Sequence, residues 1–398
     1  MKILQINSVC GVGSTGRMAT DLYRVLKDQG HECKIAYGRG TAPDGIDTIK
    51  IGSNPDNYLH VIETRLFDRH GFGSVNATGT FIKQVENYNP DVIHLHNIHG
   101  YYINIEILFR YLKSAGKPVV WTLHDCWSFT GHCAYFDYIG CDKWKTGCYA
   151  CPQKKEYPAS LFADSSKRNY EEKKELFTSV KNMTIVTPSN WLANLVKQSY
   201  LGKYPVKVIP NGIDLDIFQP IPGGFRDRYH LQNKKIILGV ANIWNFRKGL
   251  EFFLKLADKL DDSYQIVLVG VTEKQKKELP PNVLGITRTD NVKQLAELYT
   301  AADVFVNPTL EDNFPSTNLE ALACGTPVIT FNTGGSPESV DETCGLVVEK
   351  GNIDKLIEAV NRCAQQHFSS NHCIGRARLY EKGDRFNRYV EIYEGIIK

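Results

Sequence analysis

The sequence contains no apolar run that approaches the ~18 residues needed for a membrane-spanning helix. Its first residues, Met1 to Asn7, hold too short an apolar stretch for a secretion signal. A large charge of one sign is also missing, because 47 Lys and Arg nearly balance 44 Asp and Glu, and a net charge of +3 does not argue for a nucleic-acid partner. We therefore expect a cytoplasmic globular protein without nucleic acid among its partners.

One segment departs from this balance of charge. Residues 143–181 hold nine Lys or Arg against five Asp or Glu. A solvated helical face explains such a run at least as well as a functional surface does. On the functional interpretation, the basic segment predicts a peripheral contact with anionic lipid head groups at the inner face of the plasma membrane, or with a phosphate-bearing substrate.

Apolar strand-like runs alternate with helical patterns along most of the 398 residues, which predicts an α/β protein of two Rossmann-like, doubly wound domains. We predict an N-terminal domain over residues 1–212, interrupted by a cysteine-rich insertion at about 126–162. A second domain is expected over residues 213–380. Residues 381–398 are expected to form a C-terminal helix. One interpretation is that this helix crosses back to the N-terminal domain.

A glycine-rich loop follows the first expected strand. Gly11, Gly13 and Gly16 have the G-x-G-x-x-G spacing that can bind a dinucleotide between a strand and a helix. An NAD site also expects an acidic residue at the end of the second strand, where the sequence has Arg39. The loop therefore keeps an NAD-dependent dehydrogenase as an alternative, and the missing acid argues against it.

A strand–loop–helix–turn–strand pattern covers Asn307 to Ile329. Ser316 or Thr317 is expected to be the N-cap of its helix, and Gly325 to end it. Because the N–H groups at a helix start are not bonded within the helix, this one suits an anion such as a diphosphate.

Acidic and histidine side chains stand close to expected strand ends. Asp312 lies in the loop of this pattern and Glu320 in its helix, and their carboxylates suit the hydroxyls of a ribose or hexose. His124 follows another strand, and open α/β sheets bind ligands at the carboxyl ends of their strands. An ordinary α/β unit with solvated acids explains the acidic pair equally well.

Four of the eleven cysteines fall within nineteen residues of the insertion: Cys133, Cys141, Cys148 and Cys151. The last two form a C-x-x-C pair, but the full spacing is not that of a standard zinc ribbon. A structural zinc and free reduced thiols stay open as interpretations, with Cys126 and His132 as substitute ligands.

A set of motifs then covers much of the second half: Val208–Asp214, Arg247–Gly249, Asp312–Pro315, Glu320–Pro327 and Gly334–Glu338. Together they resemble the retaining nucleotide-sugar glycosyltransferases of family four. The resemblance implies the GT-B fold, in which two Rossmann-like domains face each other across a cleft. It also implies transfer of a hexose from a UDP- or GDP-sugar to a glycan or lipid-linked acceptor in surface polysaccharide synthesis, without a catalytic cofactor.

The same resemblance implies roles for individual residues. Lys248, with Arg247, would neutralise the donor diphosphate, and Glu320 would accept hydrogen bonds from the ribose. His124 matches the family position whose histidine lies beside the reacting sugar. Further donor contacts would come from Gly13, Gly16, Arg17, Gly285, Arg288, Asn313, Phe314, Pro315, Ser316 and Thr317.

Two positions depart from the family pattern. The family usually has Glu where Asp312 stands, so either Asp312 or Glu311 would hold the transferred sugar. It also commonly has Arg where Asn242 stands, and Arg247 could take over that phosphate contact. A GT-B nucleotide-sugar epimerase is the nearest alternative function, and a zinc-stapled binding protein that has lost catalysis is a more distant one.

Overall fold

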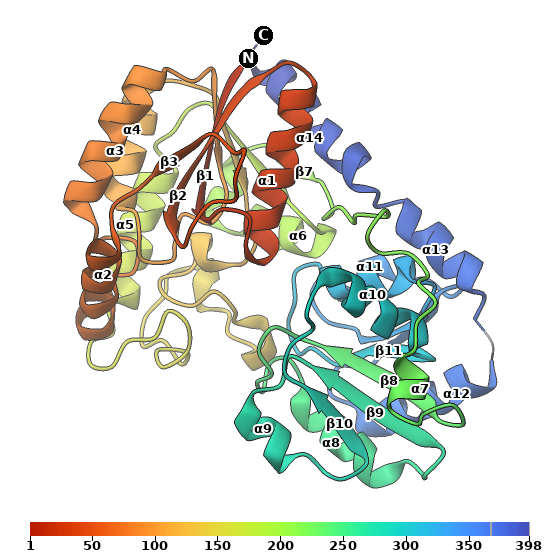
Figure 1. Cartoon of the computed structure of the whole chain (residues 1–398). Helices are drawn as coiled ribbons and strands as arrows, with labels where there is room; N and C mark the ends of the chain where they lie inside the picture. The colour runs from red at the N-terminus through yellow and green to blue at the C-terminus, as the bar shows by residue number, and fades with distance from the viewer. Residues whose placement is uncertain (367, 398) are drawn as a thin grey trace. The chain divides into compact units, whose positions relative to one another are not determined.

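The computed structural model describes residues 1–366 and 368–397. The chain divides into two compact units. Unit 1 comprises Met1–Pro210 together with the chain from Phe386 onward, and unit 2 comprises Asn211–Arg385. Each unit is a parallel β-sheet with helices on both faces (Figure 1), which confirms the predicted α/β class.

Seven strands form the sheet of unit 1, in the order β3-β2-β1-β4-β5-β6-β7. Every neighbouring pair is parallel. The strand order reverses between β1 and β4, so the loops that follow these two strands diverge at a switch point where α/β sheets bind ligands. The strands are β1 (Lys2–Val9), β2 (Glu32–Arg39), β3 (Thr48–Lys50), β4 (Val92–Leu95), β5 (Val119–Thr122), β6 (Met183–Thr187) and β7 (Val206–Val208).

The residues of β1 alternate between two buried faces of this sheet. Leu4 and Ile6 pack into one apolar cluster, whereas Ile3 packs into the other. Gln5 is also fully buried and by alternation shares the face of Ile3, where Tyr389 and Tyr393 pack. That face is covered by α1 (Gly13–Asp28) and α14 (Lys382–Ile397), and the other by α3 (Val75–Tyr88), α4 (Ile105–Ala115), α5 (Ser166–Phe177) and α6 (Asn190–Gln198).

The insertion predicted at about 126–162 consists of loops and short 3-10 turns. Its Phe129, Phe136 and Trp144 rings pack with centroids 5.1 to 6.2 Å apart and form a small apolar core. Lys173 of α5 is buried and donates to two backbone carbonyls of the insertion. Burial lowers the pKa of Lys173 to about 7. The turns are η1 (Trp127–Phe129), η2 (Asp137–Ile139) and η3 (Lys143–Lys145).

Six parallel strands form the sheet of unit 2, in the order β10-β9-β8-β11-β12-β13. Here the order reverses between β8 and β11. Figure 1 shows α10 and α11 on one face and α8 and α12 on the other. The strands are β8 (Lys235–Val240), β9 (Tyr264–Val269), β10 (Val283–Ile286), β11 (Val304–Asn307), β12 (Val328–Phe331) and β13 (Gly345–Val348), and the helices are α7 (Phe225–Arg228), α8 (Leu250–Lys259), α9 (Glu273–Glu278), α10 (Val292–Ala301), α11 (Ser316–Ala323), α12 (Ile353–Gln365) and α13 (Ser370–Arg378).

The sequence predicted the C-terminal end of α11 correctly but not its N-cap. Pro315 occupies the N-cap position, so the prediction that Ser316 or Thr317 caps this helix was wrong. Proline has no side-chain acceptor, and its fixed φ suits the turn into the helix. At the other end Gly325 has a φ of +83°, and its N–H donates to a helix carbonyl at 3.0 Å. Gly325 therefore ends the helix as predicted.

Candidate functional site

Two loops diverge at the switch point of the unit 2 sheet. The loop after β8 carries Arg247 and Lys248, and the loop after β11 carries Glu311 and Asp312. Lys248 Nζ lies 2.5 Å from Asp312 Oδ2, and an Arg247 guanidinium N–H donates to the Glu311 carbonyl at 2.6 Å. The structure thus brings together the two cations and the two candidate acids that the sequence singled out.

Glycines of the loop after β8 and of the loop after β12 pack closely against the loop after β11. Gly249 has a φ of +79°, and a Cβ there would lie 2.1 Å from the carbonyl oxygen of Pro308. Gly334 has a φ of +57°, and a Cβ there would lie 1.9 Å from the carbonyl oxygen of Asp312. The N–H of Gly335 donates to that same oxygen at 3.0 Å. These close approaches hold Lys248 and Asp312 in place and explain two of the glycine motifs.

The two acids differ in accessibility. Glu311 is fully buried, whereas the Asp312 side chain keeps 18% of its surface exposed. Burial alone would raise the pKa of Asp312, but Lys248, Arg247 and the N–H of Asn313 outweigh it and hold that pKa below its usual value. Asp312 is therefore an accessible carboxylate that stays ionised at neutral pH.

Glu320 is positioned by a residue that the sequence analysis missed. The hydroxyl of Tyr299, on α10, donates to Glu320 Oε2 at 2.9 Å. Burial raises the pKa of Tyr299, and the charge of Glu320 raises it further, so the phenol remains a donor. A tyrosine at the end of an amphipathic helix gives no local signal of such a contact.

The remaining predicted donor residues of unit 2 lie along the carboxyl edge of its sheet. Residues 313–317 lead from the Asp312 loop into the first turn of α11, and Asn211 Nδ2 donates to the Phe314 carbonyl at 3.0 Å. Gly285 is in β10, where a Cβ would lie 2.6 Å from Leu279. Arg288 is exposed just after that strand.

In unit 1, the predicted glycine loop leads directly into a helix. α1 begins at Gly13, which has a φ of +65°. Gly16 is buried, and a Cβ there would approach Val9 to 3.1 Å. Arg17 is exposed on the first turn. Gly16 is therefore explained by close packing of the helix on β1, which is a structural reason for part of the G-x-G-x-x-G spacing.

His124 stands at the end of a hydrogen-bonded row that we call the histidine row, formed by Gln5, His96 and His124. Gln5 Oε1 lies 3.0 Å from His96 Nε2, and His96 Nδ1 lies 3.3 Å from His124 Nε2. Gln5 and His96 are buried, whereas His124 is half-buried. Burial, with a smaller contribution from His99, lowers the pKa of His124 to about 4 although Asp125 opposes this, so its imidazole is neutral at pH 7.

The last helix, α14, supports His94, which lies two residues before His96 in the chain. The hydroxyl of Tyr393 lies 2.6 Å from His94 Nδ1, and the Thr122 hydroxyl lies 2.8 Å from His94 Nε2. Thr122 in turn donates to the Tyr389 hydroxyl at 3.3 Å. His94 is fully buried, as expected for a residue that faces the sheet.

Asp125, which follows His124 in the chain, binds His99. Asp125 Oδ2 lies 2.9 Å from His99 Nε2, and Asp125 Oδ1 accepts the Trp127 N–H at 2.9 Å. His99 Nδ1 lies 2.9 Å from the Tyr157 hydroxyl of the insertion. Successive side chains at a strand end point in different directions, and this places Asp125 with the insertion.

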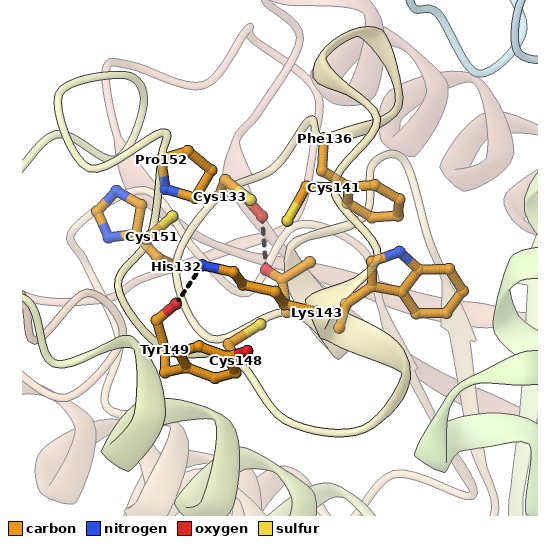
Figure 2. Close-up of a pocket in the computed structure, with 11 residues that line it drawn as sticks. His132, Cys133, Phe136, Cys141, Lys143, Cys148, Tyr149, Cys151 and Pro152 are labelled. Atoms are coloured by element: carbon orange, nitrogen blue, oxygen red, sulfur yellow. Dashed lines mark hydrogen bonds between the residues drawn. The ribbon is translucent and has the colours of Figure 1, made fainter.

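The four insertion cysteines line one pocket, together with His132 and Lys143 (Figure 2). None of the eleven cysteines, all of which lie in the described part of the chain, forms a disulfide. The Gly131 N–H donates to Cys148 Sγ at 3.2 Å, and His132 pairs with Asp68. Among residues 1–366 and 368–397, no three His, Cys, Asp or Glu side chains are arranged as the ligands of a metal ion. The structural zinc therefore stays a prediction.

Comparisons with known proteins agree with this architecture. A Glycosyltransferase Family 4 model matches residues 15–217, and a "Glycosyl transferases group 1" model matches residues 234–366. The chain is 28% identical, over the whole of both chains, to the "Putative colanic acid biosynthesis glycosyl transferase WcaC" of Escherichia coli K12.

Solved structures show the fold. A sucrose-phosphate synthase from Thermosynechococcus elongatus matches with a TM-score of 0.76 at 18% identity, over 99% of this chain and 98% of that one. Anabaena HepE with bound UDP-glucose matches with a TM-score of 0.70 at 14% identity, over 99% and 100%.

The fold and the family matches thus define a GT-B glycosyltransferase. The family model covers more than half of the sequence, and the chain belongs to glycosyltransferase family 4. This confirms the predicted family, the two-domain Rossmann-like fold and the predicted enzyme class. None of the helices in the described part of the chain is long and apolar enough to cross a bilayer.

Proposed function

We propose that the enzyme transfers a hexose from a nucleoside diphosphate sugar to a glycan or lipid-linked acceptor, with retention of anomeric configuration, in the synthesis of a surface polysaccharide. The observation that carries the donor assignment is the cluster of Lys248, Arg247 and Asp312 at the switch point of the unit 2 sheet. The full-length similarity to a protein named for colanic acid biosynthesis supports the polysaccharide setting. Structures of Anabaena HepE with UDP and UDP-glucose support a nucleotide-sugar donor.

In this proposal, Lys248 and Arg247 bind the diphosphate. The leaving group gains negative charge as the glycosidic bond breaks, and fixed cations stabilise that charge in the transition state. Glu320 accepts hydrogen bonds from the ribose hydroxyls, in the orientation set by Tyr299. Residues 313–317 contact phosphate or sugar oxygens, through backbone N–H groups at every position except Pro315, which has none. Gly285 to Arg288 frame the base.

Asp312 is the acid that we assign to the transferred sugar, because it is accessible and Glu311 is not. His124 contacts the same sugar, and Gly13, Gly16 and Arg17 contribute contacts from unit 1. The proposed retention follows the front-face displacement usual for the family, so no side chain is assigned as a covalent nucleophile.

An exposed apolar surface supports a membrane-bound, lipid-linked acceptor. Helix α2 (Asn54–Phe67) buries polar residues, such as His60, and exposes apolar ones. Two residues of the insertion, Leu161 and Phe162, are 63% and 72% exposed beside the end of α2, where the Leu161 N–H donates to a helix carbonyl at 2.8 Å. The exposed apolar residues of α2 are Tyr58, Leu59, Ile62, Leu66 and Phe67.

We assign an anionic bilayer to this apolar surface. Residues 54–67 and 143–181 together carry ten basic and seven acidic side chains, so the surrounding charge favours anionic head groups. Wild-type protein should co-sediment with vesicles that contain an anionic phospholipid, and L161S/F162S should lose most of this binding. The matched control is L379S, at a leucine that is 56% exposed in unit 2. Equal binding by wild type and L161S/F162S would contradict the assignment.

A donor panel tests the proposed reaction. UDP-, GDP- and ADP-sugars are incubated with and without a polysaccharide or lipid acceptor, and the products are separated by chromatography. Release of the nucleoside diphosphate supports transfer or hydrolysis, whereas an isomerised sugar without release supports the epimerase alternative. Failure of every donor to bind would overturn the proposal, and quenching or enhancement of NADH fluorescence on mixing would favour the dehydrogenase alternative.

A further inference from the structure

The histidine row joins three separate parts of the chain at the carboxyl edge of the unit 1 sheet. Gln5 is on β1, His96 follows β4 and His124 follows β5. The row runs from the buried amide to the half-buried imidazole, with hydrogen-bond distances of 3.0 and 3.3 Å. Because each group donates or accepts in a fixed direction, the position of every proton in the row can be derived.

The orientation of the Gln5 amide is set first. Gln5 Nε2 lies 3.0 Å from the carbonyl oxygen of Ala19, which can accept but not donate a hydrogen bond. The nitrogen must therefore face Ala19, and the amide oxygen must face His96. Since Oε1 can only accept, His96 Nε2 must carry the proton of this bond.

The proton on His96 then determines the proton on His124. Burial, with smaller contributions from His94 and His124, holds the pKa of His96 well below its usual value, so this ring is neutral and has one N–H. That N–H is on Nε2, so Nδ1 carries a lone pair. His124 Nε2 faces this lone pair at 3.3 Å and must donate to it. The remaining lone pair of a neutral His124 is on Nδ1.

We propose that Gln5 and His96 are positioning residues that hold His124 in its Nε2–H tautomer, so that His124 Nδ1 accepts a hydrogen bond from a hydroxyl of the bound sugar. The assignment rests on the proposed function, in which His124 contacts that sugar. The assignment defines which ligand group can bind at His124 Nδ1. A neutral hydroxyl can donate a hydrogen bond to this nitrogen, whereas a phosphate or carboxylate oxygen would be repelled by its lone pair.

The groups around the row favour this protonation state. Asp125, the nearest carboxylate in sequence, raises the pKa of His124, but its two oxygens bind His99 and the Trp127 N–H and burial outweighs its charge. His99 lowers the pKa of His124, and His94 lowers that of His96. The carbonyl of Ala19 and the buried thiol of Cys33 are the groups on the far side of Gln5. Neither can take the place of Gln5 Oε1 as acceptor for His96.

The direct test is the tautomer itself. Protein labelled with ¹⁵N in its histidine rings is studied by long-range ¹H–¹⁵N correlation at pH 7.5, and the signals of His124 are assigned from those that disappear in H124Q. We expect a protonated Nε2 and an unprotonated Nδ1 for His124. A protonated Nδ1 in the wild type would overturn the proposal without any activity measurement.

A matched pair of variants tests the consequence for the reaction. Asparagine and leucine have similar shapes, but an asparagine amide oxygen can replace His96 Nδ1 as acceptor and leucine offers no acceptor. We expect H96L to lower kcat/KM by about 10- to 100-fold and to mix the His124 tautomers, and H96N to stay within about 3-fold of wild type. Equal losses in both variants, with an unchanged His124 tautomer, would assign His96 a merely structural role.

The proposed function and the positioning role of Gln5 and His96 can fail separately. If His124 has the expected tautomer but no sugar nucleotide binds or reacts, the proposed function fails and the protonation of the row stands. If donors react but the tautomer is reversed, the proposed function stands and the positioning role of Gln5 and His96 is wrong.

Discussion

The ion pair between Lys248 and Asp312 gives a prediction in which its two partners have opposite effects. Two unit charges about 4 Å apart attract each other by about 4 kcal/mol at an effective dielectric constant of about 20. Both side chains are partly exposed, at 27% and 18%, so we reduce the value of the pair to about 1–2 kcal/mol. A diphosphate that binds Lys248 must compete with this carboxylate. D312N should therefore bind UDP or GDP about 5- to 30-fold more tightly than wild type, while sugar transfer falls.

Removing the cation should have the reverse effect. K248M loses a charge-assisted contact worth about 1.5–3 kcal/mol, so the affinity for the nucleoside diphosphate should fall about 10- to 150-fold. Calorimetric titration measures both variants, with the free nucleoside as a second ligand that lacks phosphate. K274M is the matched control, because the Lys274 side chain is 85% exposed in the same unit. This reasoning is refuted if K248M weakens binding of the free nucleoside as much as binding of the nucleoside diphosphate. It is also refuted if D312N does not bind the nucleoside diphosphate more tightly than wild type.

Three further predictions concern other parts of the chain. Y299F removes the hydrogen bond to Glu320 and should weaken nucleotide binding by about 1 kcal/mol, which the same titration detects; unchanged affinity would mean that Tyr299 does not position Glu320. Burial lowers the pKa values of His60, His94 and His124 to about 4, 3 and 4. Because the unfolded chain binds these protons near pH 6.5 and the folded chain does not, the free energy of unfolding should fall from pH 6.5 to 5 by up to about 1.4 kcal/mol per histidine per pH unit, and urea titrations that give a constant value would contradict this. Metal analysis of protein purified without added zinc decides the state of the pocket cysteines: about one ion per chain establishes a structural zinc, and substoichiometric metal establishes free thiols.

The sequence contained enough information to predict both sheets and the placement of the main candidate residues. Apolar strand-like runs alternate with segments of helical periodicity, and the observed strands and helices follow this order. The Arg247–Gly249 and Asp312–Pro315 motifs were predicted as parts of one site, and the structure brings the side chains of Lys248 and Asp312 together. Loops that follow parallel strands share one edge of a sheet, so their proximity follows from topology alone.

Side-chain partners that depend on strand register could not be predicted in this way. Gln5 and His96 are 91 residues apart, and their hydrogen bond exists because β1 and β4 are neighbours in a specific register. Helix α3 was missed as well. It contains Gly79 and several residues with low helix propensity, and it is held by the packing of Phe81 and Val85 in the core. In each case tertiary contacts decide the outcome, and a local window of sequence does not contain them.

The last helix has a practical consequence for recombining family members. Tyr389 and Tyr393 of α14 hydrogen-bond to Thr122 and His94 of unit 1, although they lie more than 260 positions later in the chain. A chimera that exchanges the second half of this enzyme at a single crossover near residue 210 would join a foreign last helix to the native first sheet. Such hybrids need two crossovers, with the segment from Phe386 onward inherited together with Met1–Pro210. On the proposed function, such a hybrid would exchange the donor-binding residues of unit 2 and keep the residues that surround His124.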